Sequence, residues 1–385
     1  QEPLLTPEER NPATRKLLRG GLSEVPLLMK RSTQRTAVEL ANAQRRELSG
    51  EACLKLPHAV TLAGGERESH FRVAKLTEAK PWRRPISLKA AADGPTAGVG
   101  ELRLSTQRRD YVFPVPVVIV KTGRRRLSLR RSDGCVTVDT GWLRFKVSAE
   151  HGGSIVSLER RGRELVRSSY PTPRPYHWMN PWYGGVLARA GSRWDRRLHV
   201  VRRSIEPVSV VGATGIRWEG AQVTCTPTHQ DWRWLRYKVQ YLSTAGSNLL
   251  AVVLTAANRT SARMGVYIGV AFWPADVTGQ AYVERDGKPM VYNADRYEYT
   301  VRAGNWLAFA VGRGAVLGAV APRRDPSWRL GLENLGDGLF SASVGRRADL
   351  NPKVGSVTEV AWLVGCRSVE EAHAYRFLSE LAELP

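Results

Sequence analysis

Short segments in which apolar and polar residues alternate recur along most of the chain. Between residues 143 and 147, three apolar side chains alternate with Arg144 and Lys146, which is the period of a strand with one buried face. Two glycines at positions 152 and 153 interrupt this pattern, and residues 155–158 form a second apolar run. The pattern predicts two strands joined by a glycine turn, and we expect this hairpin to organise the larger part of the protein.

The strand-like segments fall into two groups. From residue 34 to residue 122 they follow one another at spacings of about ten residues, with turn residues between them, which is typical of a β-sandwich. A larger group runs from residue 134 to residue 366 and contains Asp286 and Gly287, a pair that favours a type I′ hairpin turn. We therefore expect two β domains that meet between residues 122 and 134.

Helix signals are confined to the two ends of the chain. A capping pattern that begins at Thr6 lies within residues 1–33, which we expect to be an N-terminal extension with short helices. A second capping pattern begins at Ser368 and is followed by apolar residues at helical spacing. This predicts a C-terminal helix within residues 367–385. The predicted fold class is therefore all-β, with short helices at the two ends.

The larger β region resembles a known fold in the order of its motifs. A strand and a Gly-Gly turn are followed by Ile-x-Ser-Leu at residues 155–158 and by Gly-x-Glu-Leu at residues 162–165. This order resembles the opening of the galactose-mutarotase-like β-supersandwich, which occurs in aldose 1-epimerases, in the C-terminal part of α-mannosidases and in polysaccharide lyases. An apolar strand at residues 249–258, followed by Asn-x-Thr and another strand, extends the resemblance over residues 134–366. The resemblance implies a domain that recognises carbohydrates.

The smaller β region has a different resemblance. Its motifs are Val-x-Leu-x-Asn at residues 38–42, Gly-x-x-x-Leu-x-x-Pro at residues 50–57 and Leu-x-Gly-Gly-Glu at residues 62–66. Their order resembles the immunoglobulin-like accessory domains that are attached to glycosidases. This implies an immunoglobulin-like β-sandwich over residues 34–125 that acts as a spacer.

The chain is strongly basic. It has 385 residues and a formal net charge of +22, and only 11 of its 58 basic residues are lysine. Arginine richness is consistent with a hot habitat or GC-rich coding, and it also attracts polyanions. The most basic stretch, residues 121–131, is consistent with a solvated linker or with a patch that binds phosphate or sulfate. Because this stretch has no interleaved aromatic residues, we do not expect nucleic acid to be the partner.

Four cysteines are far apart and lack the spacing of a metal site. We expect buried thiols, whereas one or two disulfides would indicate a secreted or hyperthermophilic origin. No run of about 18 apolar residues indicates a membrane-spanning helix. We expect an extracellular or cell-surface protein that uses no metal and no cofactor.

Two aromatic segments carry the candidate site, and we expect both to face one cleft. The first, residues 170–185, combines tyrosine, tryptophan, histidine and arginine with four prolines. Aromatic rings stack on sugar rings, and arginine pairs with carboxylates or sulfates. The second, residues 229–236, is predicted as a strand in which alternate residues share one face. The candidate catalytic residues are Tyr176, His177, His229 and Asp231, and the candidate substrate-binding residues are Arg174, Trp178, Trp182, Tyr183 and Arg233.

The resemblance also bears on the reaction. Epimerases of this fold use histidine and a carboxylate as acid and base, and Ala271 occupies the position that matches one of those histidines. We expect no aldose 1-epimerase activity, because alanine cannot transfer a proton. The favoured function is binding of a glycan, with an acidic polysaccharide as the favoured class and cleavage by a lyase or a hydrolase reaction left open. The alternative is a non-catalytic accessory or structural portion of a larger secreted glycosidase or cell-surface assembly.

Overall fold

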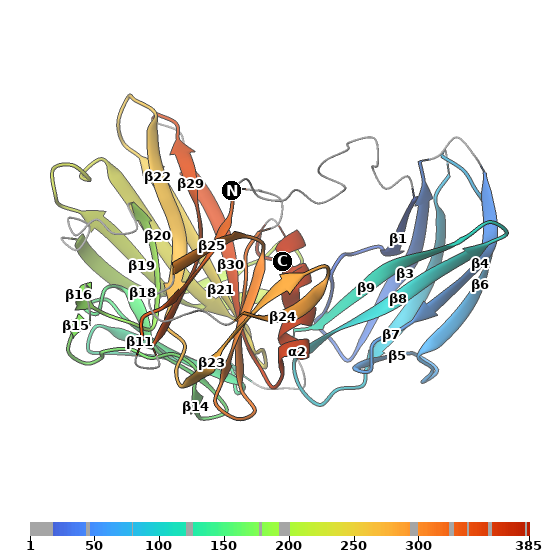
Figure 1. Ribbon diagram of the computed structural model, residues 1–385, viewed down its shortest axis with the longest axis horizontal. Helices are drawn as coiled ribbons and strands as arrows, with labels where there is room; N and C mark the ends of the chain where they lie inside the picture. Colours follow the sequence, from blue (N-terminus) through green and yellow to red (C-terminus); the bar gives the residue numbers. More distant parts are fainter. Residues whose placement is uncertain are drawn as a thin grey trace. The chain divides into compact units, whose positions relative to one another are not determined.

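Strands make up nearly all of the regular structure, so the all-β prediction is confirmed. The chain divides into two compact units, residues 1–123 (unit 1) and residues 124–385 (unit 2) (Figure 1). The computed structural model describes residues 18–43, 47–78, 80–120, 126–176, 179–191, 201–292, 299–322, 327–336, 339–352, 356–381 and 383–385. The capping pattern predicted at Thr6 lies outside these residues.

The described part of unit 1 forms two sheets around one core. Its strands are β1 (Leu18–Leu22), β2 (Leu27–Met29), β3 (Thr33–Asn42), β4 (Leu48–Lys55), β5 (Val60–Leu62), β6 (Glu68–Leu76), β7 (Trp82–Ala90), β8 (Thr96–Thr106) and β9 (Asp110–Ile119). One sheet has the order β1–β3–β7–β5, and the other has the order β2–β9–β8–β4–β6. Leu40 and Leu54, from different sheets, are fully buried in the same cluster.

The described part of the N-terminal extension is paired with the sheets of unit 1. The short helices expected in the extension begin at the capping pattern of Thr6, which lies outside the described residues. From Leu18 on, β1 pairs antiparallel with β3, and β2 pairs parallel with β9. The physical reason is burial: Leu22, Leu27 and Met29 lie in the core of unit 1, and the backbone beside them bonds to the neighbouring strands. This segment therefore belongs to the sandwich.

The described part of unit 2 also forms two large sheets. Its strands are β10 (Ser128–Ser132), β11 (Cys135–Asp139), β12 (Leu143–Ser148), β13 (Ser154–Arg160), β14 (Arg163–Glu164), β15 (Arg174–Tyr176), β16 (Met179–Trp182), β17 (Val186–Gly191), β18 (Val201–Val211), β19 (Arg217–Pro227), β20 (Leu235–Ser243), β21 (Leu249–Asn258), β22 (Met264–Phe272), β23 (Val277–Arg285), β24 (Lys288–Tyr292), β25 (Tyr299–Ala303), β26 (Trp306–Val311), β27 (Val316–Val320), β28 (Arg329–Asn334), β29 (Phe340–Leu350) and β30 (Ser356–Cys366). The ten-stranded sheet has the order β10–β11–β12–β13–β17–β22–β29–β28–β25, with β14 beside β13, and the nine-stranded sheet has the order β18–β19–β20–β21–β30–β27–β26–β23–β24. The hairpin of β15 and β16 is a separate two-stranded sheet.

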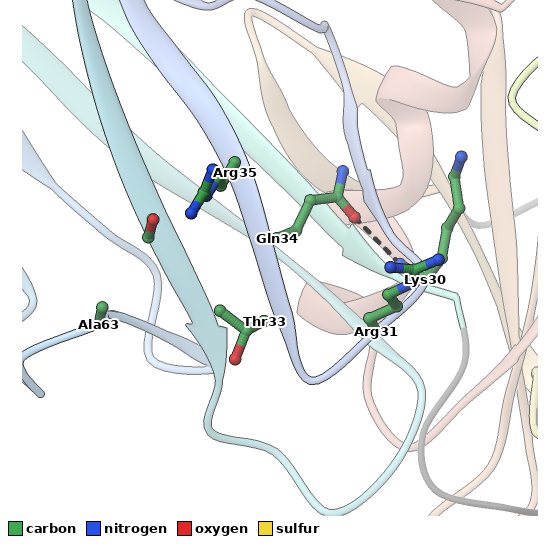
Figure 2. A pocket seen from close by; sticks show the side chains of 7 residues that line it. Lys30, Arg31, Thr33, Gln34, Arg35 and Ala63 are labelled. Atoms are coloured by element: carbon green, nitrogen blue, oxygen red, sulfur yellow. Dashed lines mark hydrogen bonds between the residues drawn. The ribbon is translucent and has the colours of Figure 1, made fainter.

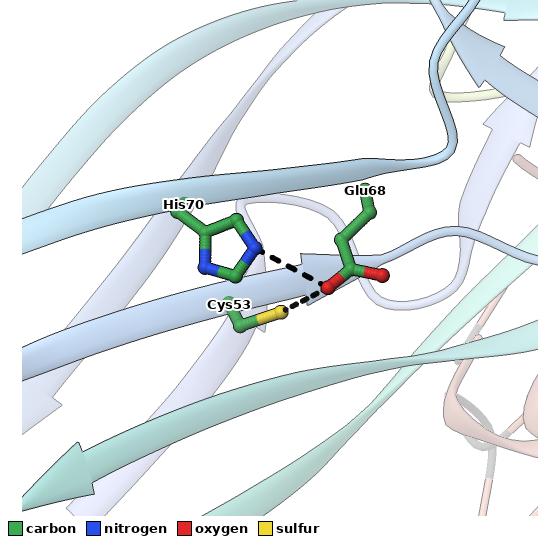
Figure 3. Close-up of side chains that lie close together, drawn as sticks. All are labelled: Cys53, Glu68 and His70. Atoms are coloured by element: carbon green, nitrogen blue, oxygen red, sulfur yellow. Dashed lines mark hydrogen bonds and ion pairs between the residues drawn. The ribbon is translucent and has the colours of Figure 1, made fainter.

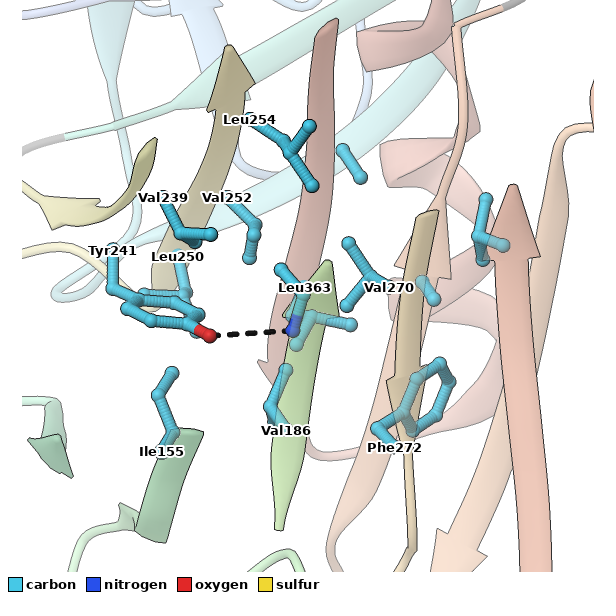
Figure 4. Close-up of a cluster of buried hydrophobic side chains, with 14 of the residues drawn as sticks. Ile155, Val186, Val239, Tyr241, Leu250, Val252, Leu254, Val270, Phe272 and Leu363 are labelled. Atoms are coloured by element: carbon cyan, nitrogen blue, oxygen red, sulfur yellow. Dashed lines mark hydrogen bonds between the residues drawn. The ribbon is translucent and has the colours of Figure 1, made fainter. Parts of the chain in front are cut away.

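One tyrosine links the two large sheets inside the core. Tyr241, on β20, is fully buried, and its hydroxyl accepts a hydrogen bond from the Ala188 amide at 3.3 Å (Figure 4). The same hydroxyl donates a hydrogen bond to the Gly153 carbonyl at 3.1 Å. Here β13 and β17 share a single residue pair, Ile155 with Val186. The hydroxyl therefore satisfies buried backbone groups where the ladder between these strands is short.

Two turns predicted from the sequence are confirmed. β12 and β13 pair antiparallel on either side of Gly152 and Gly153, both of which have positive φ angles of 73° and 69°. β23 and β24 pair antiparallel around Asp286 and Gly287, with φ angles of 51° and 74°. Positive φ at both central residues is the signature of the type I′ turn.

The C-terminal helix is present but shorter than expected. α2 (Val369–Ala374) begins where Ser368 caps it by accepting a hydrogen bond from the Glu371 amide at 3.2 Å. The chain then continues as the 3-10 helix η3 (Tyr375–Glu380). α2 is held by the indole of Trp306, which donates to the Ala372 carbonyl at 2.9 Å.

Candidate functional site

The first aromatic segment forms a hairpin whose best-packed ring is buried. Arg174 on β15 lies opposite Trp182 on β16. Trp182 is only 4% exposed and packs with Trp273, Leu335 and Leu339. The ring of Tyr176, which is half-buried, lies 5.1 Å from that of Trp182. His177 and Trp178 lie outside the described residues. In this hairpin Arg174 and Tyr176 are therefore available to a ligand, whereas Trp182 supports the hairpin from below.

The position that matches an epimerase histidine lies in the same apolar cluster. Ala271 on β22 is half-buried and packs against the cluster that contains Trp182 and Trp273. Its partner across the sheet, Leu187 on β17, packs there too. This position therefore contributes an apolar contact and no group that exchanges a proton.

Glycines lie next to this cluster on the same face of the ten-stranded sheet. Gly269 on β22 lies opposite Gly345 on β29. A Cβ atom at Gly269 would lie 2.8 Å from the hydroxyl oxygen of Tyr267, and one at Gly345 would overlap that oxygen. The Tyr267 ring therefore lies across both glycines and occupies space that larger residues would fill.

Sequence reasoning missed a buried histidine beside the hairpin. His151, in the glycine turn after β12, is 2% exposed, and its Nε2 lies 3.2 Å from the Ser169 hydroxyl and 3.1 Å from the Tyr183 carbonyl. Burial lowers the pKa of His151. The rings of Tyr183 and Tyr170 meet the imidazole edge-on, at 5.1 and 5.6 Å. Its place next to two glycines in a predicted turn was the available signal.

A cation lies on the exposed side of this aromatic cluster. Lys146 on β12 donates to the Tyr170 hydroxyl at 2.9 Å, and its ammonium lies 4.5 Å from the centre of the Tyr170 ring. The hydrogen bond to Tyr170 raises the pKa of Lys146. Tyr170 is 38% exposed. The cluster therefore presents an aromatic ring and a positive charge to solvent, while the imidazole behind them is buried.

The second aromatic segment is a turn, which corrects the strand predicted for residues 229–236. β19 ends at Pro227 and β20 begins at Leu235, so the alternation that would put His229, Asp231 and Arg233 on one face does not apply. The Nδ1 atom of His229 lies 3.8 Å from the Asp231 carboxylate and accepts a hydrogen bond from the Asp231 amide at 3.3 Å. Arg233 is exposed. Local bonds between close neighbours form this turn.

The structure does not bring the two aromatic segments together. The hairpin of β15 and β16 packs near the Phe272 end of β22, where β17 begins. The turn at residues 228–234 lies near the other end of that strand, because the Trp234 carbonyl accepts a hydrogen bond from the Arg259 amide in the loop that precedes β22. The two segments lie at different ends of unit 2 (Figure 1). Tyr176 and the His229–Asp231 pair therefore do not share one site.

A cationic pocket lies in unit 1, at the turn between β2 and β3. It is an open hollow with a volume of about 620 Å³, lined by Lys30, Arg31, Thr33, Gln34, Arg35, Ala63 and Ser87 (Figure 2). The Gln34 side chain accepts a hydrogen bond from the Lys30 amide at 3.3 Å and so helps to shape the turn. Three cations and two hydroxyls line the pocket, and none of the lining residues is acidic. Such a lining suits an anionic ligand with hydroxyl groups. Sequence reasoning missed it, although the basic residues are close together in the chain.

All four cysteines are free thiols, which agrees with the expectation of thiols and not with the alternative of disulfides. Cys135, Cys225 and Cys366 are buried, whereas Cys53 is partly exposed. Among the described residues, none of the helices has the length and apolar character to cross a membrane.

A search of solved structures finds proteins with a similar arrangement of strands. One is the GH36 α-galactosidase AgaB from Geobacillus stearothermophilus, with 11% identity and a TM-score of 0.45 over 63% of this chain and 41% of that chain. Another is a galactose mutarotase-like protein from Clostridium acetobutylicum, with 9% identity and a TM-score of 0.44 over 63% of this chain and 99% of that chain. A third is a TPR-domain containing protein from Parabacteroides distasonis, with 9% identity and a TM-score of 0.40 over 88% of this chain and 56% of that chain.

The identities of 9–11% and the TM-scores of 0.40–0.45 describe a partial likeness in the arrangement of strands. The α-galactosidase is the longer protein, since this chain spans 41% of its length. No protein-family model and no curated protein matches the sequence.

Proposed function

We propose that this protein binds an anionic glycan and that the cationic pocket of unit 1 holds an acidic group of that glycan. The proposal concerns binding and includes no cleavage step. The described acid–base candidates support this restriction, because Tyr176 and the His229–Asp231 pair lie at different ends of unit 2. This proposed binding function is closest to the role of a non-catalytic accessory portion in a carbohydrate-active assembly.

The composition of the pocket lining is the observation that carries the proposal. Arg31 and Arg35 present guanidinium groups, which pair with carboxylates and sulfates through two parallel hydrogen bonds. Lys30 adds a third positive charge. The volume of about 620 Å³ is within the range of about 300–1,000 Å³ typical of small-ligand pockets. The net charge of +22 attracts anions from a distance, which favours association with an acidic polymer over a neutral one.

The choice of a glycan among anions rests on hydroxyl and aromatic groups. Thr33 and Ser87 add hydroxyls to the pocket, and hydroxyls both donate to and accept from sugar hydroxyls. In unit 2, Tyr176 and Tyr170 offer partly exposed rings beside the cations Arg174 and Lys146. We propose these rings as a separate contact surface for sugar within unit 2. The sequence resemblance to carbohydrate-recognising domains supports the same choice.

Affinity electrophoresis in gels that contain pectate, alginate, heparin or neutral dextran tests the proposal. Pectate and alginate carry carboxylates, and heparin also carries sulfates, so the gels distinguish the acidic groups. The test variant is Arg31→Gln/Arg35→Gln, and the matched control is Arg72→Gln/Arg83→Gln, which removes two exposed charges of unit 1 outside the pocket. We expect retardation of wild type and control in at least one acidic gel, and near-free migration of the test variant.

Two results would contradict the proposal. One is equal migration of the wild-type protein in acidic and neutral gels. The other is equal retardation of the two double variants, which would mean that net charge alone causes the retardation. Competition by duplex DNA at the same salt concentration separates glycan binding from a general affinity for polyanions, because phosphate contacts respond steeply to salt.

A further inference from the structure

Three side chains with different metal-binding groups meet on the outer face of the five-stranded sheet in unit 1. Cys53 on β4 lies directly opposite His70 on β6. Glu68 precedes His70 by two residues, so the two side chains share one face of β6. Antiparallel pairing therefore brings together a thiol, an imidazole and a carboxylate that are far apart or unremarkable in the sequence (Figure 3).

The distances between these groups match those between ligands of one metal ion. The Cys53 thiol lies 3.2 Å from Oε1 of Glu68, and Nε2 of His70 lies 3.3 Å from the same oxygen. All three candidate ligand atoms lie within 4.8 Å of one another. Tetrahedral zinc has bonds of about 2.3 Å to sulfur and about 2.0–2.2 Å to nitrogen and oxygen, which places its ligands roughly 3.4–3.6 Å apart. The triad therefore needs only small side-chain movements to surround an ion.

We propose that Cys53, Glu68 and His70 form a binding site for a divalent metal ion of the zinc type, with solvent in the fourth position. Thiolate, imidazole and carboxylate together suit zinc and cobalt rather than calcium or magnesium, which take oxygen ligands. Binding removes the thiol proton of Cys53, which passes to solvent, and the sulfur then bonds to the metal. The charges of the thiolate and the carboxylate balance those of the ion.

The residues around Cys53, Glu68 and His70 can orient the ligands and leave the site accessible to solvent. Lys55 lies 3.7 Å from Oε2 of Glu68, the oxygen that the thiol and the imidazole do not share, so it can orient the carboxylate from outside. Arg103, opposite Cys53 on β8, is paired with Glu101 at 2.9 Å. The side chains of Glu68 and His70 are 47% and 68% exposed, which leaves an entry path and an open coordination position.

The experiment is a titration of the reduced full-length chain with Co²⁺, without oxygen. We expect a thiolate-to-cobalt charge-transfer absorption in the near ultraviolet, which Zn²⁺ abolishes by displacement. Cys53→Ser should lose this band, because the remaining cysteines are buried. His70→Gln and Glu68→Gln should weaken Co²⁺ binding by about 10-fold or more, since even indirect partners of a metal change affinity by about 10–100-fold.

Two control variants separate the triad from the surface around it. Glu51→Gln removes an exposed carboxylate from β4, and His58→Gln removes an exposed imidazole from unit 1. Both should bind Co²⁺ as the wild-type protein does, and circular dichroism should show the same β content in every variant. The proposal is overturned if the wild-type protein shows no thiolate band in excess Co²⁺ or if Cys53→Ser retains the band. It is also overturned if His70→Gln and Glu68→Gln bind as tightly as the two controls, because the thiol would then act alone.

Discussion

The Nε2 atom of His151 lies 3.2 Å from the Oγ atom of Ser169, and this contact fixes the protonation of the imidazole. Ser169 donates its own proton to the Trp182 carbonyl at 2.6 Å, so its oxygen accepts from the histidine. The proton of the neutral ring is therefore on Nε2. Nδ1 is buried and has no hydrogen-bond partner among the described residues. Protonation at Nδ1 would bury a charge without an acceptor, which explains why burial lowers the pKa of His151.

This geometry predicts a stability that depends on pH. Because the folded-state pKa lies below the value of 6.5 for the unfolded chain, the unfolded state binds more protons as the pH falls below 6.5. The contribution of the neutral His151 side chain to the free energy of unfolding is therefore complete above pH 6.5, and it is lost as the pH decreases through the folded-state pKa. His151→Gln cannot take up this proton, so its free energy of unfolding should change less between pH 7 and pH 5 than that of the wild type. Urea unfolding at several pH values gives the change of the free energy of unfolding with pH for the wild type and for His151→Gln. Equal pH dependence in the two proteins would show that His151 does not contribute.

Because Trp182 is buried, we expect its replacement to lower the stability of the fold rather than to remove a direct contact with a glycan. Trp182→Ala should lower the free energy of unfolding by about 3–5 kcal/mol, the usual cost of deleting a buried aromatic ring. Tyr176→Ala is the matched comparison from the same hairpin, and it should cost less because Tyr176 is half-buried. Thermal unfolding measures the loss of stability in each variant, and glycan binding measured on the same variants shows whether a direct contact is lost. A stable Trp182→Ala protein with weakened glycan binding would instead support direct stacking on Trp182, as expected from the sequence.

The glycines beneath Tyr267 predict a contrast between two substitutions in one sheet. Gly345→Ala would overlap the Tyr267 hydroxyl and approach the Ile268 carbonyl to 2.8 Å, so it should destabilise the protein by about 1–3 kcal/mol. Gly265→Ala, on the neighbouring strand, meets nothing nearer than an Asp349 oxygen at 3.7 Å and should change stability by less than about 0.5 kcal/mol. Denaturant unfolding of both variants gives the comparison. Equal costs would mean that Tyr267 moves aside without penalty.

The sequence predicts those features of the fold that depend on close neighbours. The hairpin of β12 and β13 follows from alternating side chains and two glycines, and the Asp286 turn follows from a residue pair that tolerates positive φ. Features that depend on distant contacts do not follow. The burial of Trp182 is set by Leu335 and Leu339, which lie far along the chain. Residues 229–234, predicted as part of a strand, form a turn, because alternation over so few residues is a weak signal.

The candidate site shows the same limit. The aromatic content of residues 170–185 was visible in the sequence, but its orientation was not, since the Trp182 ring faces the protein. The pocket near Arg31 and Arg35 depends on Ser87, which a neighbouring strand brings beside β3. Pairing between strands creates such a site, and single-sequence patterns do not specify which strands pair.

Calorimetric titration with trigalacturonate and with its fully methyl-esterified form tests the central claim most directly. The two ligands have the same sugar rings and differ in charge, so they isolate the contribution of the cationic pocket. The account predicts binding of the acidic form only. It also predicts an affinity lowered by about 100-fold or more in Arg31→Gln/Arg35→Gln, because charged hydrogen bonds contribute about 1.5–3 kcal/mol each and the variant removes two guanidinium groups. The Arg72→Gln/Arg83→Gln control should bind as the wild type does. Equal affinity for both ligands, or unchanged affinity in the pocket variant, would contradict the account.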